Sequence, residues 1–166
     1  MSTSRDFLCE VIDLARDNVR KGGRPFGAVL VKDGAVIATG VNEIHMTQDP
    51  TTHAELQAIR AASRALGSPR LDGCVIYASG HPCPMCLSAM YLTGIREVTY
   101  AYSNEDGEPY GLSTAAIYAE LAKPLAEQSL KATHLPLRAG AEGDLYQMWR
   151  DAASAPLDGS GSGRSA

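Results

Sequence analysis

The chain has 166 residues, of which 45% are hydrophobic and 20% charged, and its formal net charge is −4. This length and composition suit one globular domain with a sizeable core, and no apolar run approaches the ~20 residues that a membrane-spanning helix needs. The sequence contains no block of Lys or Arg. That absence argues against a nucleic-acid partner and favours a small-molecule ligand, and the lack of a long apolar run argues against a membrane partner.

The N-terminus and the cysteine content indicate a cytoplasmic protein. Met1 to Arg5 are mostly polar and lead into an amphipathic stretch, so they do not resemble a signal peptide. Four cysteines, two of them in one short motif, fit a reducing compartment better than a disulfide scaffold.

The first half of the chain predicts one helix and a hairpin. Apolar residues recur at helical spacing over residues 7–19, before a pair of glycines. Two apolar runs, 27–31 and 35–38, flank an Asp-Gly pair, which is a strong signal for a β-hairpin. A loop is expected over 42–49.

The middle of the chain alternates between helix and strand. We expect a helix over 53–66, a strand over 74–78, a helix over 84–93 and a strand over 98–102. Strands that alternate with helices of this length form a mixed sheet covered by helices on both faces.

The C-terminal part carries weaker signals. We expect a loop over 103–114, a helix over 115–122, a strand over 132–137 and an amphipathic helix over 145–149. The predicted fold is therefore α/β, a three-layer α/β/α sandwich with a central mixed five-stranded sheet. One domain is expected over residues 1–154, followed by a flexible Gly/Ser-rich tail over 155–166.

Two short motifs indicate a zinc site with a catalytic role. His53-Ala54-Glu55 is followed by Pro82-Cys83-Pro84-Met85-Cys86, and an imidazole with two thiolates makes a three-ligand zinc set. A catalytic zinc keeps its fourth position for water, whose pKa it lowers toward ~7. Glu55 is the candidate general base that takes the proton and returns it to a leaving group.

The spacing of these motifs predicts how they meet. His53 and Glu55 point to nearly opposite sides of a helix, so both reach one metal only if the helix end faces the site. Asp49-Pro50 is a candidate N-cap and first residue for the first helix, as Cys83-Pro84 is for the second. Two helix N-termini aimed at one point would stabilise thiolates and a developing negative charge.

Two other interpretations use the same residues. A CxxC pair alone also occurs in redox proteins and zinc knuckles, and a closed structural site would need a fourth ligand, for which Cys74 is the main candidate. The joint pattern of His-x-Glu and Pro-Cys-x-x-Cys is instead the signature of zinc nucleobase deaminases, in which the glutamate moves protons and is not a ligand.

On these motifs, together with Pro25-Phe26-Gly27-Ala28-Val29, Asn42 and Asp49-Pro50, the chain resembles the cytidine and deoxycytidylate deaminase superfamily over roughly residues 5–150. Within it the chain is most similar to the bacterial guanine deaminases. The resemblance implies a cytidine deaminase-like fold and one zinc ion per chain. It also implies substrate contacts from Phe26, Asn42, Ala54 and Pro82.

The chain departs from the guanine deaminase pattern at three places, one of which is near Leu92, where an aromatic residue is usual. Neutral residues occupy Gly111 to Thr114, where an acidic residue is usual, and Asp106 and Glu108 are the nearest acids that could replace it. His81 stands where a glutamate is usual, either beside the metal or as a polar residue at a helix entry.

The resulting functional hypothesis is hydrolytic deamination of a free amino-substituted heterocyclic base, with guanine as the leading candidate. The alternatives are another free heterocycle such as cytosine, a pterin or an aminotriazine, a tRNA adenosine deaminase, or a zinc-stabilised binding module without enzymatic activity. Tyr146, Met148 and Trp149 on the terminal helix need burial, which predicts a homodimer. The resemblance implies that the C-terminal segment can swap between subunits.

Overall fold

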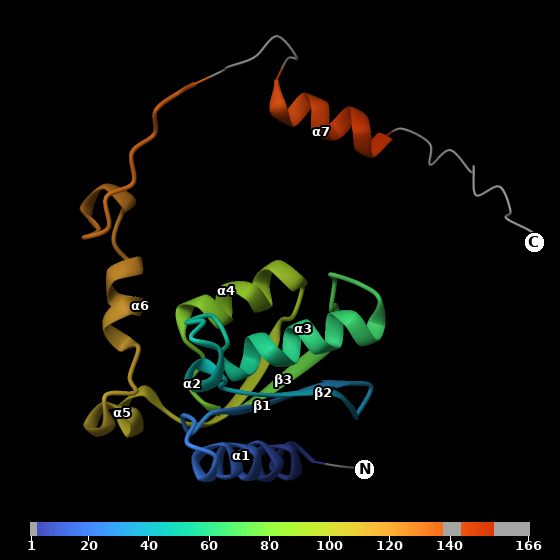
Figure 1. The fold of residues 1–166 in the computed structure, drawn as a ribbon, viewed down its shortest axis with the longest axis vertical. Coiled ribbons are helices and arrows are strands. Elements are labelled where there is room, and N and C mark those ends of the chain that lie inside the picture. The colour runs from blue at the N-terminus through green and yellow to red at the C-terminus, as the bar shows by residue number, and fades with distance from the viewer. Residues whose placement is uncertain (1–2, 138–143, 155–166) are drawn as a thin grey trace, which may run out of the picture. The chain divides into compact units, whose positions relative to one another are not determined.

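The computed structural model describes residues 3–137 and 144–154 (Figure 1). These residues belong to two compact units, of which the first ends at Ser129 and the second begins at Leu130. The predicted tail, 155–166, lies outside the described residues. None of the helices described is long and apolar enough to span a membrane.

The first helix, α1 (Ser4–Arg20), begins at a capping box. The Thr3 hydroxyl accepts a hydrogen bond from the backbone N–H of Asp6, and the Asp6 carboxylate accepts one from the N–H of Thr3. Phe7, Val11 and Ala15 are spaced four residues apart and are buried. The predicted helix is therefore confirmed, with one apolar stripe facing the sheet.

The predicted hairpin is confirmed as β1 (Gly27–Lys32) and β2 (Ala35–Val41). The strands pair antiparallel, with Lys32 opposite Ala35. Asp33 and Gly34 have φ angles of 50° and 77°. A two-residue turn with positive φ at both positions matches the right-handed twist of the flanking strands.

The sheet has the strand order β2-β1-β3-β4, with β3 over Cys74–Gly80 and β4 over Glu97–Tyr102. The β1–β3 pair is antiparallel and the β3–β4 pair is parallel, so the sheet is mixed. Helix α1 covers one face, and α3 (Ala54–Leu66) and α4 (Pro84–Thr93) lie on the other (Figure 1). The three-layer α/β/α arrangement is confirmed.

The predicted fifth strand is wrong. Residues 131–137 contain no strand, and the sheet formed by the described residues has four strands. Pro136 lacks the N–H that a ladder requires, and an apolar pattern does not by itself supply a neighbouring strand edge.

Several short elements complete the described chain. The predicted loops at 42–49 and 103–114 each contain short helical turns, and the predicted C-terminal helix is confirmed and extends to Ser154. These elements are α2 (Ile44–Thr47), α5 (Asn104–Gly107), a 3₁₀ turn (Glu108–Tyr110), α6 (Ala115–Leu121), a second 3₁₀ turn (Leu125–Glu127) and α7 (Leu145–Ser154).

A close approach between β2 and α3 sets the position of the helix that follows His53. A Cβ added at Gly40 would lie 2.2 Å from the carbonyl oxygen of Ala54 and 2.6 Å from the backbone nitrogen of Ala58. Both neighbours are backbone atoms, so glycine is required here for space. The first turn of α3 is thereby held directly against the sheet.

Candidate active site

Two helix N-termini carry the predicted ligands. His53 is the N-cap of α3, and Cys83 is the N-cap of α4, where Pro84 occupies the first turn as predicted. The prediction that Asp49-Pro50 starts the first of these helices is wrong. The Asp49 carboxylate instead accepts hydrogen bonds from the Thr51 N–H and hydroxyl, both at 2.7 Å, which closes an Asx turn before His53.

Three donor atoms converge between these helix ends. The Sγ atoms of Cys83 and Cys86 are 3.6 Å apart, and His53 Nδ1 lies 3.4 Å from the first and 3.7 Å from the second. Tetrahedral zinc with Zn–S near ~2.3 Å and Zn–N near ~2.05 Å separates two sulfurs by about 3.8 Å and a sulfur from a nitrogen by about 3.6 Å. The donor types and their spacing therefore both fit a zinc ion.

The electrostatics of the donors also favour a cation. The hydrogen bond between the two sulfurs lowers the pKa of Cys83 to about 4 and, with burial, raises the pKa of Cys86. The hydrogen bond to Cys83 raises the pKa of His53. Two thiols that share one proton bind a divalent ion by releasing that proton.

Glu55 lies beside this donor triangle, in the first turn of α3. Its side chain is buried, and its Oε2 atom accepts a hydrogen bond from Cys86 Sγ at 3.5 Å. Burial raises the pKa of the Glu55 carboxyl group. A raised pKa brings a carboxylate closer to the operating range of a group that both accepts and returns a proton.

A cavity of about 190 Å³ opens onto these groups. It is smaller than the roughly 300–1,000 Å³ that drug-sized ligands occupy, so it suits one small planar molecule. Of the four predicted substrate contacts, Phe26 and Asn42 line this cavity, whereas Ala54 and Pro82 are buried outside its lining. The lining residues are Arg24, Phe26, Asn42, His53, Glu55, His81, Cys83, Gly111, Leu112, Ser113 and Thr114.

A buried asparagine on α1 holds two segments of this wall in place. Asn18 Nδ2 donates to the carbonyl oxygens of Arg24, at 2.8 Å, and Asn42, at 2.9 Å. The Asn42 N–H donates in turn to the carbonyl of Phe26, at 3.2 Å. Asn18 could not be predicted from the sequence, because a single asparagine inside a helical pattern carries no signal of its own.

The loop at 103–114 closes another side of the cavity. The side chain of Asn104 is buried, and its Oδ1 accepts a hydrogen bond from the Thr114 N–H at 3.0 Å. Beyond the loop, the Tyr118 hydroxyl on α6 donates to the carbonyl oxygen of Pro82 at 2.5 Å. These contacts fix the neutral segment that ends at Thr114 against the metal-ligand loop.

The two acids considered as replacements within this loop do not line the catalytic cavity. Asp106 forms a capping box with Ser103, and Glu108 begins a 3₁₀ turn. Among the lining residues described, Glu55 is the one carboxylate.

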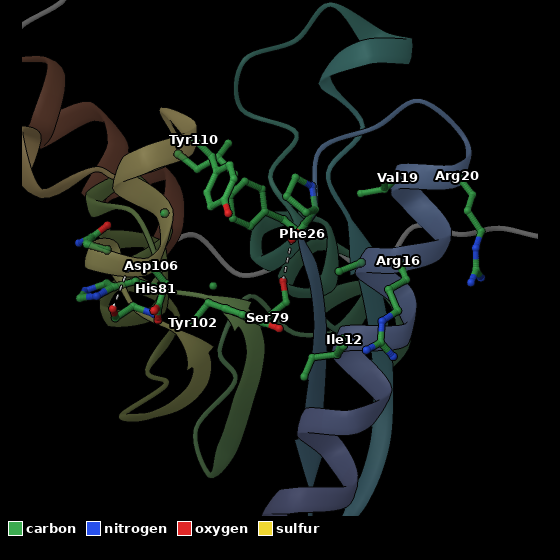
Figure 2. Close-up of a pocket in the computed structure, with 17 residues that line it drawn as sticks. Ile12, Arg16, Val19, Arg20, Phe26, Ser79, His81, Tyr102, Asp106 and Tyr110 are labelled. Carbon is green, nitrogen blue, oxygen red and sulfur yellow. Dashed lines mark hydrogen bonds between the residues drawn. The ribbon is translucent and has the colours of Figure 1, made fainter.

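A larger cavity, of about 740 Å³, adjoins the catalytic one and shares Phe26, His81 and Leu112 with it. Figure 2 shows its two sides, with Ile12 and Arg16 on α1 facing His81 and Asp106 across Phe26. A Cβ added at Gly80 would lie 2.9 Å from the Phe26 ring. The missing side chain at this position therefore helps to set where the ring stands between the two cavities.

Comparison with known proteins agrees with this geometry. Residues 1–102 match the family model described as the cytidine and deoxycytidylate deaminase zinc-binding region. The chain belongs to this family.

Individual deaminases match over most of the chain. It is 42% identical to the guanine deaminase of Bacillus subtilis (strain 168), over 89% of this chain and 94% of the relative. The X-ray structure of guanine deaminase from B. subtilis superposes with a TM-score of 0.81 at 40% identity, over 90% of this chain and 95% of that one. A tRNA-specific adenosine deaminase of Aquifex aeolicus is 32% identical over 82% of this chain and 87% of its own length.

Family membership confirms the predictions of a zinc cofactor and of a hydrolytic nucleobase deaminase. It removes the hypothesis of a binding module without enzymatic activity. Cys74, the candidate fourth ligand, is buried in β3 and is not part of the donor cluster formed by His53, Cys83 and Cys86.

Proposed function

We propose that this deaminase hydrolyses the C2 amino group of free guanine, giving xanthine and ammonia. The observation that carries the proposal is the position of Glu55, buried against Cys86 beside the His53–Cys83–Cys86 triangle and open to a cavity sized for a single base. The identity of 42% to a guanine deaminase supports the choice of base.

We infer that His53, Cys83 and Cys86 hold the zinc, which when bound acts as a Lewis acid that favours ionisation of a water molecule. Glu55 accepts a proton from the water that attacks C2. It then delivers that proton to the ring nitrogen and assists departure of the amino group as ammonia. Water supplies the new oxygen and the leaving group carries away the nitrogen, so the reaction needs no redox partner.

The protein also has to hold the ring flat and exclude bulk water. We propose that Phe26 stacks on the base and that the Asn42 amide hydrogen-bonds to its edge. Ala54 and Pro82 remain proposed contacts through their positions next to His53 and Cys83. The Asn104–Thr114 hydrogen bond fixes the loop segment that lines one side of the cavity.

A homodimer is proposed as the active form. Leu145, Tyr146 and Trp149 on α7 are each more than 70% exposed in the single chain, which is a large apolar surface for one short helix. A contact between two copies through this helix would bury it. Exchange of the C-terminal segment between subunits is the arrangement that the resemblance implies.

An ammonia-release screen tests the substrate. Zinc-loaded protein is assayed with guanine, adenine, cytosine, a pterin, an aminotriazine and tRNA. We expect guanine to give kcat/KM of ~10⁴ M⁻¹s⁻¹ or above, the lower end of ordinary enzymes. Turnover confined to tRNA would overturn the proposal in favour of the adenosine deaminase branch, and a preference for another free heterocycle would change the named substrate alone.

A further inference from the structure

Arg24 is a cation on the wall of the catalytic cavity whose charge is not neutralised locally. Arg24 is among the residues that line the cavity, with Phe26 and Asn42, and it is exposed. Its guanidinium makes no hydrogen bond or ion pair with any residue that the structure describes. Arg16 and Arg20, on the preceding helix, are by contrast paired with Asp13 at 2.9 Å and Asp17 at 2.6 Å. Arg24 is thus available for a ligand.

The backbone of Arg24 is held firmly. Its carbonyl oxygen accepts hydrogen bonds from Asn18 Nδ2 at 2.8 Å and from the Phe26 N–H at 2.8 Å. The same Asn18 amide holds the carbonyl of Asn42. A guanidinium whose chain position is fixed loses less freedom when it binds, and it donates two parallel hydrogen bonds in one plane.

Asn42 adds a second donor to this wall. Its side chain is 1% exposed, and its Oδ1 accepts a hydrogen bond from the Ile44 N–H at 3.3 Å. That bond orients the amide so that Nδ2, which has no partner among the described residues, is the group left for the ligand. Together with Arg24 it adds donors to a lining in which Glu55 is the one carboxylate among the described residues.

We propose that Arg24 is the specificity-determining residue of this site and that it selects heterocycles whose non-reacting edge carries two adjacent acceptors. On guanine these acceptors are O6 and N7, the pair that a guanidinium binds with two hydrogen bonds. This proposal rests on guanine being the substrate. It explains how the site holds a purine when Glu55 is the one acid among the described residues of its lining.

The same wall rejects adenine. The corresponding edge of adenine presents the N7 acceptor beside the N6 amino donor. The Arg24 guanidinium would then face the N6 amino group, which is also a donor. One hydrogen bond of Arg24 would be lost, and an N–H group would be left unpaired. The hydrogen-bond donors on this wall therefore discriminate between the two purines. The position of the amino group on the ring discriminates between them as well.

The test compares Arg24→Ala and Arg24→Lys with the parent on guanine and on 7-deazaguanine, in which a C–H replaces N7. Lys21→Ala is the matched control, since it removes a nearby exposed cation that lines neither cavity. We expect Arg24→Ala to raise KM for guanine about fivefold or more with kcat changed less than threefold, because a good bidentate contact discriminates by at least that factor. Arg24→Lys should recover part of the loss.

The analogue separates a direct contact from a structural effect. The parent should bind 7-deazaguanine more weakly than guanine, and Arg24→Ala should treat the two alike. Two results would overturn the role of Arg24 and leave the proposed function intact. One is a KM for guanine in Arg24→Ala within twofold of the parent value. The other is the same ratio of KM for 7-deazaguanine to KM for guanine in parent and variant. If the zinc-loaded parent releases no ammonia from guanine, the proposed function and this inference both fail.

Discussion

The hydroxyl of Tyr118 donates a hydrogen bond of 2.5 Å to the carbonyl oxygen of Pro82, the residue just before the first cysteine ligand. The contact joins α6 to the loop that begins α4 across 36 residues of sequence. Burial raises the pKa of Tyr118 to about 12, so the phenol keeps its proton at neutral pH.

Replacement of Tyr118 by Phe should weaken both the fold and the site. Loss of a neutral hydrogen bond costs about 0.5–1.5 kcal/mol, and the carbonyl of Pro82 is left without this donor. We expect a lower Tm by a few degrees and a few-fold fall in kcat/KM. Tyr91→Phe, at a tyrosine that is 61% exposed, is the control. Equal Tm and kcat/KM in the two variants would show that the contact has no such role.

Removal of the cysteine ligands should remove zinc. The parent is expected to contain about one zinc per chain, and the Cys83→Ala, Cys86→Ser double variant should contain little and unfold at lower temperature, because metal-binding free energy contributes to folding. Elemental analysis and thermal melts measure both effects. Cys74→Ala should keep its zinc, since Cys74 lies outside the donor cluster. Full zinc occupancy in the double variant would disprove the ligand assignment.

Replacement of Glu55 by Gln should separate catalysis from metal binding. The amide keeps the shape of the side chain but cannot accept a proton, so turnover should fall by a factor of at least ~10² while the zinc content stays at the parent level. Glu97→Gln, at an exposed position on β4, is the matched control. Turnover within threefold of the parent would remove Glu55 from the mechanism.

The apolar side chains of α7 predict self-association. Light scattering at micromolar concentration should give the mass of a homodimer, and Trp149→Glu should shift the population toward monomer because a charge would be buried in the contact. Lys131→Glu, also in the second unit and at an exposed site, controls for charge alone. A monomeric parent would contradict the proposed assembly.

Local chemistry explains what could be predicted without a structure. The Asp33-Gly34 turn demands positive φ at two adjacent residues, and Pro84 suits the first turn of a helix, so both features follow from neighbouring residues. The prediction that Asp49-Pro50 starts a helix was wrong for a related reason. A helix cap and an Asx turn use the same side chain, and only the hydrogen bonds to Thr51 distinguish them.

The chemistry of this protein could be predicted from its amino-acid sequence, because zinc binding and proton transfer require particular side chains at particular short spacings. Tertiary structure decided which other residues surround that chemistry. Arg24, Asn18 and Tyr118 belong to no motif. Asn18 reaches Asn42, and Tyr118 reaches Pro82, through contacts between distant segments. The number of strands was decided in the same way, since a strand requires a partner edge that an apolar pattern at 132–137 cannot provide.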